Sequence, residues 1–368
     1  MTTTNAPTEN LTGPIGTTPD DVAPQVQTNG AAPHALLRAG FPYYATLGMR
    51  RVTTYCMDIA IGDEDRLYVL CRDDGPAGNA IRKINWDDED LGTIGKSGTG
   101  EGQLVWPVTL IRDGGENLYV SDEGLHRISA FRRDGTFIGH WGSHGAEPGQ
   151  LNRPSGITFD ADENVWVADT MNHRVQQFTR DGRFLLTFGR HGSGDGEFDM
   201  PWGIAVDRAG DVYVADWRND RVQKFSPDGR FLVQFGRTGS GDGEFNRPAG
   251  LTVDGDGDIY VADRGNNRVQ LFDRTGRYVE QFIGDATLSK SGRTYVLANP
   301  KVLRMREMNT LKQQKRFRGP AAVRLDAEGR MYVPDFGSHR IQVYKKEAYP
   351  LTPEEIWPEQ AAPTLYTV

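Results

Sequence analysis

Arginine and aromatic side chains stand beside two markers that recur along this chain: a proline that opens each repeated unit and an aspartate that ends its second strand. An arginine binds a carboxylate or a phosphate through bidentate hydrogen bonds, and an aromatic ring offers surface area for stacking. Gathered at one end of a fold, such side chains suit a small anionic ligand that is partly planar or apolar. We therefore select as candidate ligand-binding residues Trp106, Arg153, Trp202, Trp217, Arg218, Arg247, Arg264 and Phe336.

Three more residues beside these markers are candidates for proton transfer or nucleophilic attack: Glu123, Tyr55 and Cys71. A carboxyl, a phenol and a thiol can each serve as acid, base or nucleophile. No triad or metal-ligand set supports any of them, so the sequence assigns no individual roles. Cys71 falls opposite Cys56 across a predicted hairpin, where the two are either a thiol pair or two buried small side chains.

The elements that must position these residues repeat along the chain. Pro107, Pro154, Pro201 and Pro248 are spaced by 47 residues. The last three open units that each contain a strand ending in Val-Ala-Asp, an Asn-x-Arg-Val segment and a turn ending in Gly. Short alternating apolar runs predict strands, and the turn glycines supply a positive φ without strain. Four short strands at this period predict the blade of a β-propeller.

The recurring Pro-x-Gly, Tyr-Val-Ala-Asp and Asn-x-Arg-Val motifs resemble the NHL-repeat family over about residues 43–344. The resemblance implies an all-β fold: a six-bladed β-propeller of four-stranded antiparallel blades, here expected over residues 35–347. The sixth blade, residues 319–344, lacks an outer strand. Residues 43–48 match the missing strand, so we expect this N-terminal segment to pair into the last blade and close the ring.

Residues that recur in most blades are explained by the repeat rather than by a site. Asp216 with Arg221, and the equivalent pairs, predict charge-assisted hydrogen bonds that hold the loop after the second strand. His126, His173 and His339 each precede a repeat arginine, where histidine is common in NHL repeats. Because they belong to separated blades, we do not expect them to bind one metal ion together.

In an NHL propeller the first strand of each blade lines a central channel, so the residue between Pro and Gly should lie at its mouth. In peptidylglycine amidating lyases of this family, histidines at this position in several blades bind zinc. None of the six is histidine here, and the resemblance therefore argues against that metal site. We predict no metal ligands and no cofactor, although a structural Ca²⁺ or Zn²⁺ in the channel stays open. The six residues are Met57, Val108, Ser155, Trp202, Ala249 and Ala321.

Two tryptophans at the mouth have two interpretations. Trp202 and Trp217 either line a ligand site or plug the channel, since an apolar mouth is common to both.

An insertion over residues 285–318 separates blades 5 and 6 and carries a net charge of +7. Asn299-Pro300 is a good cap and first position for a helix. A short amphipathic helix is predicted because apolar residues follow at helical spacing, at Val302, Met305, Met308 and Leu311. Its place between blades suggests a lid over the mouth. A helix that docks a protein partner and a weak anion patch are the alternatives.

The composition limits the classes of partner. The whole chain has a net charge of -8, which disfavours nucleic-acid phosphates and anionic membranes as partners. Its two cysteines exclude a disulfide framework. We expect a cytoplasmic protein without a membrane segment, with a disordered N-terminal tail over residues 1–34 and a C-terminal tail over residues 348–368.

These features favour a small-molecule-binding propeller, an intracellular non-redox enzyme of the lyase, hydrolase or isomerase class that acts on a small anionic substrate at the channel mouth. A non-catalytic protein-interaction propeller is the alternative, because fold does not imply function. RNA binding through the basic insertion is the third prediction, and steep salt dependence would distinguish it.

Overall fold

The computed structural model describes residues 35–48, 52–75, 78–307 and 311–351. The larger compact unit of the chain consists of residues 38–347. The tails predicted over residues 1–34 and, for the most part, 348–368 lie outside the described residues. Strand β1 (Ala35–Gly40) pairs with β28 (Glu347–Leu351) in a two-stranded sheet.

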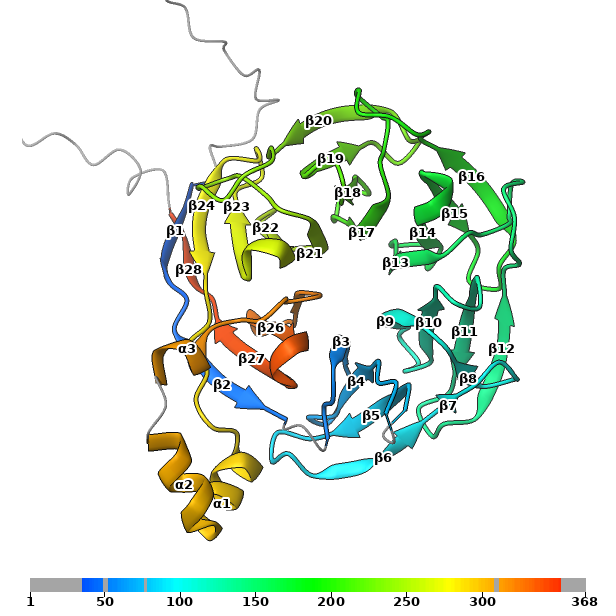
Figure 1. Ribbon diagram of the computed structural model, residues 1–368. Helices are drawn as coiled ribbons and strands as arrows, with labels where there is room; N and C mark the ends of the chain where they lie inside the picture. The colour runs from blue at the N-terminus through cyan, green and yellow to red at the C-terminus, as the bar shows by residue number, and fades with distance from the viewer. Residues whose placement is uncertain (1–34, 49–51, 76–77, 308–310, 352–368) are drawn as a thin grey trace, which may run out of the picture. The chain divides into compact units, whose positions relative to one another are not determined.

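The larger unit is an all-β ring of six four-stranded antiparallel sheets around a central channel (Figure 1). The predicted fold class is therefore confirmed. Blade 1 consists of β3 (Cys56–Ile61), β4 (Leu67–Cys71), β5 (Ala80–Ile84) and β6 (Asp90–Ile94), and blade 2 of β9 (Pro107–Arg112), β10 (Leu118–Asp122), β11 (Arg127–Phe131) and β12 (Phe137–Trp141). Blade 3 consists of β13 (Pro154–Phe159), β14 (Val165–Asp169), β15 (Arg174–Phe178) and β16 (Phe184–Phe188), and blade 4 of β17 (Pro201–Val206), β18 (Val212–Asp216), β19 (Arg221–Phe225) and β20 (Phe231–Phe235). Blade 5 consists of β21 (Pro248–Val253), β22 (Ile259–Asp263), β23 (Arg268–Phe272) and β24 (Tyr278–Phe282), and blade 6 of β25 (Arg324–Leu325), β26 (Arg330–Asp335) and β27 (Arg340–Lys345) with β2 (Tyr43–Leu47).

Short elements connect the blades and their strands. They are a parallel pair of β7 (Lys96–Ser97) and β8 (Gln103–Leu104), and the 3₁₀ turns η1 (Thr170–Asn172), η2 (Arg264–Asn266) and η3 (Phe336–Ser338).

A large aromatic side chain in the second strand of each blade fills the space between neighbouring blades. Tyr213, Tyr260 and Tyr332 are at most 2 % exposed, although each carries a polar hydroxyl. Each hydroxyl donates to the aspartate that begins the preceding turn, at 2.8–3.1 Å. Burial raises the pKa of all three phenols, which keeps them protonated as donors. The repeated Tyr of the sequence motif is thus a core residue with a satisfied polar end.

The recurring aspartate and arginine form buried ion pairs in blades 3 to 6, as the repeat predicted. In blade 2 the equivalent Arg127 bonds Ser129 and two backbone carbonyls instead. Asp216 is fully buried and accepts from Arg221 Nε at 2.9 Å and from Asn219 at 2.8 Å. Its other oxygen accepts the backbone N–H of Asp199, which leads into the same blade, at 2.8 Å. Each such aspartate therefore ties together the loop after the second strand and the segment that enters the blade.

The N-terminal strand closes the ring, as expected. β2 pairs antiparallel with β27 in the last blade, with Leu47 opposite Ile341. Leu47 is 3 % exposed and packs with apolar residues of blades 6 and 1. Both ends of the ring are also held on blade 5, because Arg38 Nε and Lys346 Nζ each lie 2.9 Å from a carboxylate oxygen of Asp258.

The insertion contains three short helices instead of the single helix predicted: α1 (Lys290–Ala298), α2 (Pro300–Glu307) and α3 (Leu311–Lys315). α2 does begin at Pro300, while the predicted apolar position at Met308 lies outside the described residues. Among the described residues, no helix has the length and apolar composition needed to cross a lipid bilayer.

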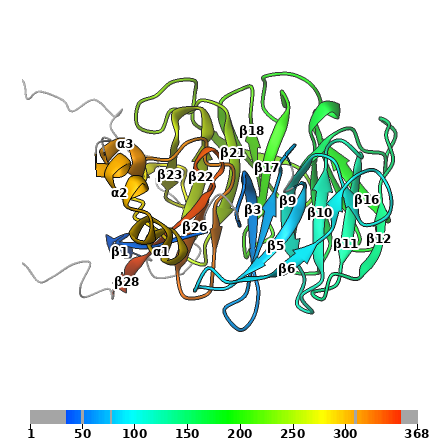
Figure 2. The ribbon, with the colours of Figure 1, turned by 60° about the horizontal axis from the view of Figure 1, so that its bottom comes forward.

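The insertion does not form the expected lid. Lys290 Nζ lies 2.5 Å from Asp87, and the Ser291 N–H donates to Asp88, both in the outer turn of blade 1. These contacts hold α1 at the outer circumference of the ring rather than over the channel (Figures 1 and 2). The lid hypothesis is wrong for the described residues because the chain leaves β24 on the outside of the ring.

Candidate functional site

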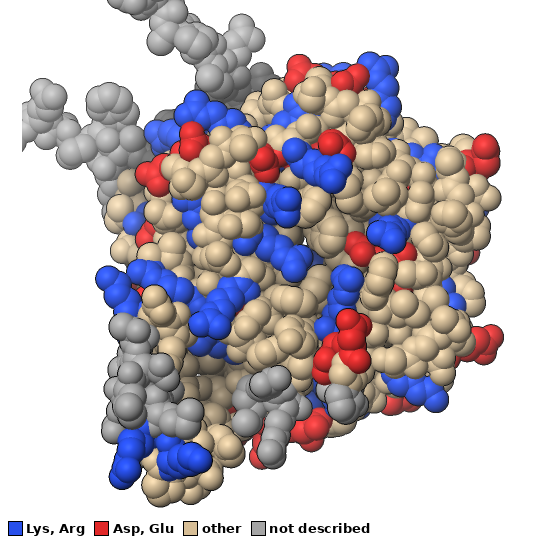
Figure 3. Space-filling model, viewed as in Figure 1, with Lys and Arg blue, Asp and Glu red and all other residues tan. Residues whose placement is uncertain are grey.

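Lys and Arg side chains gather around the centre of one face of the ring (Figure 3). The backbone brings the two marker positions of each blade together on this face. The N–H of Arg72 donates to the carbonyl of Tyr55 at 3.1 Å, and the N–H of Glu123 donates to that of Trp106 at 3.0 Å. The residue before each proline and the residue after each aspartate therefore lie side by side at the channel mouth.

Trp106 is the centre of a cationic cluster. The guanidinium groups of Arg72 and Arg153 lie 5.4 and 5.3 Å from the centroid of its ring, within the range of cation–π contacts. Arg72 also lies 3.9 Å from the carboxylate of Glu123. Trp106 is 37 % exposed and Arg153 is exposed, so solvent reaches this cluster.

The positive charge of this arginine cluster is only partly neutralised by Glu123. Burial raises the pKa of the Glu123 carboxyl, while Arg72 and Arg153 oppose that shift. Burial lowers the pKa of Arg264, and the neighbouring Arg72 lowers it further. Three guanidinium groups therefore act on one carboxylate, and a bound anion would relieve their mutual repulsion.

A second group at the mouth is aromatic. The rings of Trp202 and Trp217 have centroids 5.8 Å apart, and Arg247 lies 5.0 Å from the centroid of Trp217. Phe336 is covered in the same way by Arg264 at 5.2 Å, whereas Arg218 is exposed. Three of the sequence-selected arginines, Arg153, Arg247 and Arg264, thus each lie over an aromatic ring.

The channel beneath the mouth is nearly filled. Trp202 and Phe336 pack against a core that includes Met57, Val108 and Ala321. The cavity left below Trp202 is about 20 Å³, room for about one water molecule. The geometry of Trp202 therefore matches the plug interpretation, and a ligand at the mouth would rest on this plug.

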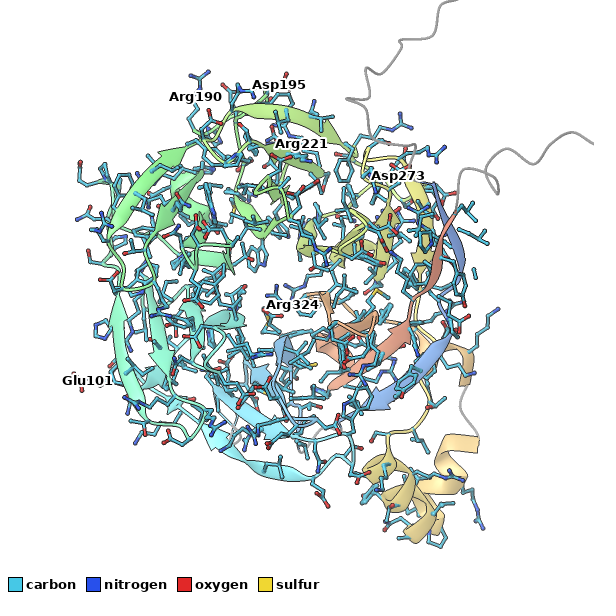
Figure 4. All side chains as sticks on the ribbon, turned by 180° about the vertical axis from the view of Figure 1, so that it is seen from behind. Glu101, Arg190, Asp195, Arg221, Asp273 and Arg324 are labelled. Atoms are coloured by element: carbon cyan, nitrogen blue, oxygen red, sulfur yellow. The ribbon has the colours of Figure 1, made fainter. Side chains whose placement is uncertain are left out.

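Deeper in the channel, Arg324 points toward the centre of the ring (Figure 4). Its guanidinium pairs with the 1 %-exposed side chain of Asp58, with Nε 2.9 Å from Oδ1. A cavity of about 800 Å³ opens at this opposite end, where Arg112 pairs with Asp63 at 3.3 Å. No sequence motif predicts this cavity, because the turns between strands shape it. We retain the mouth as the candidate site because the four arginines that line this cavity already have carboxylate partners: Arg66, Arg112, Arg324 and Arg330.

Tyr55 packs at the edge of the mouth. Its ring lies 5.2 Å from that of Phe336, and its N–H donates to Nδ1 of His339 at 2.9 Å. It adopts a left-handed backbone, with φ 46°. These contacts place the phenol ring beside Phe336 and His339, while the backbone carbonyl of Tyr55 accepts from the N–H of Arg72.

Cys71 lies opposite Cys56 as expected, and both are free, buried thiols. Burial raises the pKa of Cys71 to about 12 and also raises that of Cys56. The environment is that of two small core side chains rather than an activated nucleophile.

We expect both thiols to resist alkylation in the folded protein. A pKa of about 12 leaves only about one thiolate in ten thousand at pH 8 for Cys71. Iodoacetamide labelling followed by mass spectrometry should modify neither cysteine until denaturant is added. Rapid labelling of Cys71 in the native protein would restore it as a candidate nucleophile.

The repeat histidines have a role that the sequence did not indicate. Each accepts, at Nδ1, the backbone N–H of the residue before the next blade's first strand, at 3.0 Å for His126, 3.1 Å for His173 and 2.9 Å for His339. Each also adopts a left-handed backbone that aims the side chain across the junction. Asp220 makes the same bond at the junction of blades 4 and 5, and Asn267 makes it at the junction of blades 5 and 6, so this position links consecutive blades.

One such histidine lies in a group that resembles a metal site. Ligand atoms of His173, His191 and Asp199 all lie within 4.8 Å of one another. However, the Nδ1 lone pair of His173 already accepts the N–H of Met200. A neutral imidazole has one lone pair, so coordination would break this junction bond. We therefore assign His173 to the structure of the ring.

Comparisons with known proteins agree with this architecture. The NHL-repeat family model matches residues 151–178, 198–225 and 245–272. No curated protein sequence matches the chain. The fold and the repeats together define a six-bladed β-propeller. More particularly, three of its six blades contain segments that match the NHL repeat.

Solved structures with a similar fold include enzymes. A streptogramin B lyase is 12% identical, with 88% of this chain and 89% of that chain covered and a TM-score of 0.54. An inactive virginiamycin B lyase from Staphylococcus aureus with quinupristin is 14% identical, with coverages of 86% and 90% and a TM-score of 0.53. A gluconolactonase from Xanthomonas campestris is 14% identical, with coverages of 84% and 100% and a TM-score of 0.54. Likeness at these identities shows the fold alone.

Proposed function

We propose that the channel mouth binds a small molecule through its carboxylate group, and that Arg72 and Arg153 make the principal contacts with that group. The observation that carries this proposal is the pair of guanidinium groups held over one partly exposed tryptophan ring. Planar guanidinium groups form bidentate hydrogen bonds with carboxylates and phosphates, and Trp106 fixes their position.

The proposed activity is non-redox catalysis of the lyase, hydrolase or isomerase class. Glu123 is the proton-transfer group in this proposal, because burial raises its pKa and so favours its protonated form closer to neutral pH than in an exposed glutamate. The similar folds of two lyases and a gluconolactonase support the enzyme class without identifying a substrate.

A protein-binding role is the second candidate. The mouth rests on a nearly filled channel, and Trp106 and Arg153 face solvent. A shallow cationic surface of this kind also fits an acidic peptide segment, in which case no turnover accompanies binding.

Thermal denaturation with a panel of small carboxylates and aromatic acids tests the binding site. A ligand at 100 times its Kd should stabilise the native protein by about 2.7 kcal/mol. We expect Arg72→Gln with Arg153→Gln to abolish that shift, since both guanidinium groups that face Trp106 are removed. Arg237→Gln, at an exposed pair with Glu244 in another loop, is the matched control. A shift that survives in the double variant would place the ligand elsewhere.

A further inference from the structure

A separate cavity of about 520 Å³ lies where the insertion meets blade 6. Its polar lining comes from three basic side chains, Lys315, Arg318 and Arg340, together with Thr287, Gln314, Ser338 and His339. No Asp or Glu lines it among the described residues. Cationic and hydroxyl or amide donors without a carboxylate form an environment that suits an anion.

The equivalent junctions of the other blades show what the insertion has changed. The carbonyl of Glu244 accepts from Arg268 at 2.8 Å, and the carbonyl of Arg316 accepts from Arg340 at 2.9 Å. Arg316 thus occupies a position that is a glutamate in blades 4 and 5 and a glutamine in blades 2 and 3. Where it is a glutamate, it pairs with an arginine of its own loop, as Glu244 does with Arg237 at 2.9 Å.

A second position at the junction also becomes basic. The backbone N–H of Asp199 donates to Asp216, and that of Arg318 donates to Asp335 in the same way, at 2.8 and 2.6 Å. At this position the other regular blades have neutral residues, namely Val105, Asn152 and Asn246. Two positions that are acidic or neutral in blades 2 to 5 are therefore basic at this one junction, which leaves a surplus of positive charge around the cavity.

The three basic side chains that line the cavity differ in whether they already form an ion pair. Arg340 is paired with the buried Asp335 at 3.0 Å. The side chains of Lys315 and Arg318 are exposed and form no ion pair within the described part of the chain. These two groups are therefore available for a ligand, while Arg340 adds a fixed positive potential behind them.

We propose that this cavity binds a small phosphate monoester, with Lys315 and Arg318 as the ligands of the phosphate. A dianionic phosphate matches two unpaired cations better than a single carboxylate does. The volume exceeds that of a phosphate group, and Ala286 and Leu288 supply an apolar wall for a small organic moiety. The site is distinct from the mouth site of Arg72 and Arg153 and does not depend on it.

Isothermal titration of the full chain with glycerol phosphate, at fixed ionic strength, tests this proposal. We expect saturable binding with one ligand per chain and no binding of glycerol. Lys315→Gln with Arg318→Gln should weaken binding at least tenfold, and Lys315→Gln alone should weaken it severalfold. Arg237→Gln, from the regular junction, and the mouth double variant Arg72→Gln with Arg153→Gln should each bind as the unaltered protein does.

Several outcomes would overturn the proposal. They are the absence of saturable binding to the unaltered protein, equal affinity in the Lys315 and Arg318 variants, and loss of binding in the mouth variant alone. The last result would assign the phosphate to the mouth and would support the proposed function while removing this site. Melting temperatures of all variants should match, which separates a lost ligand contact from a lost fold.

Discussion

Removal of β2 by starting the chain at residue 48 is expected to abolish cooperative unfolding of the propeller. β27 would become an open edge strand, and the core around Ile341 and Val343 would lose its cover. Loss of Leu47 alone should cost about 2–5 kcal/mol, a large part of a typical total stability of about 5–15 kcal/mol. Thermal and urea denaturation followed by circular dichroism measure the effect.

A rearranged chain is the control for this truncation. The N–H of Lys345 donates to the carbonyl of Pro42 at 3.0 Å, so β27 and β2 are close enough to be joined directly. A variant that begins at residue 48 and ends with Lys345, Asn-Gly and residues 43–47 should regain a cooperative transition. Failure to regain it, or a cooperative transition in the truncated chain, would contradict closure by β2.

Asp216→Ala is expected to destabilise the protein by about 3–5 kcal/mol, because it leaves the guanidinium of Arg221 buried without its counter-charge. Asp216 is 0% exposed and Arg221 only 8% in the side chain. The variant also removes the acceptor for the Asp199 N–H. The free energy of unfolding from urea titration is the measurement.

An exposed pair supplies the comparison for this variant. Arg237 pairs with Glu244, but its side chain is 81% exposed. Arg237→Gln should cost less than about 1 kcal/mol, because solvent screens the pair. Equal losses in the two variants would show that burial does not determine the contribution of the repeat ion pairs.

The fold could be predicted from the sequence because its determinants are local and periodic. A strand ending in Val-Ala-Asp, followed by a turn and Arg-Val, specifies the same hydrogen bonds in each regular unit. The closing role of residues 43–48 followed from counting strands, since one blade lacked its fourth. The single helix expected in the insertion was harder to assign, because no repeat constrains that segment.

The candidate site could be predicted only as a set of positions. The repeat placed Trp106, Arg153 and Glu123 on one face, and the structure shows the contacts between them. The nearly filled channel depends on how Trp202 packs against residues of blades 1, 2 and 6. Such packing arises between blades far apart in sequence, so no motif records it. The burial of Cys71 and the outward position of α1 also depend on contacts between segments far apart in sequence.

Isothermal titration with one small dicarboxylate, succinate, against three forms of the protein tests the mouth site most directly. We expect Arg153→Gln to weaken binding at least tenfold relative to the unaltered protein. Glu123→Gln should strengthen it, because the variant removes the carboxylate that competes with the ligand for Arg72. Opposite changes in the two variants are the result that the account predicts. Unchanged affinity in both variants would contradict an anion site at the channel mouth.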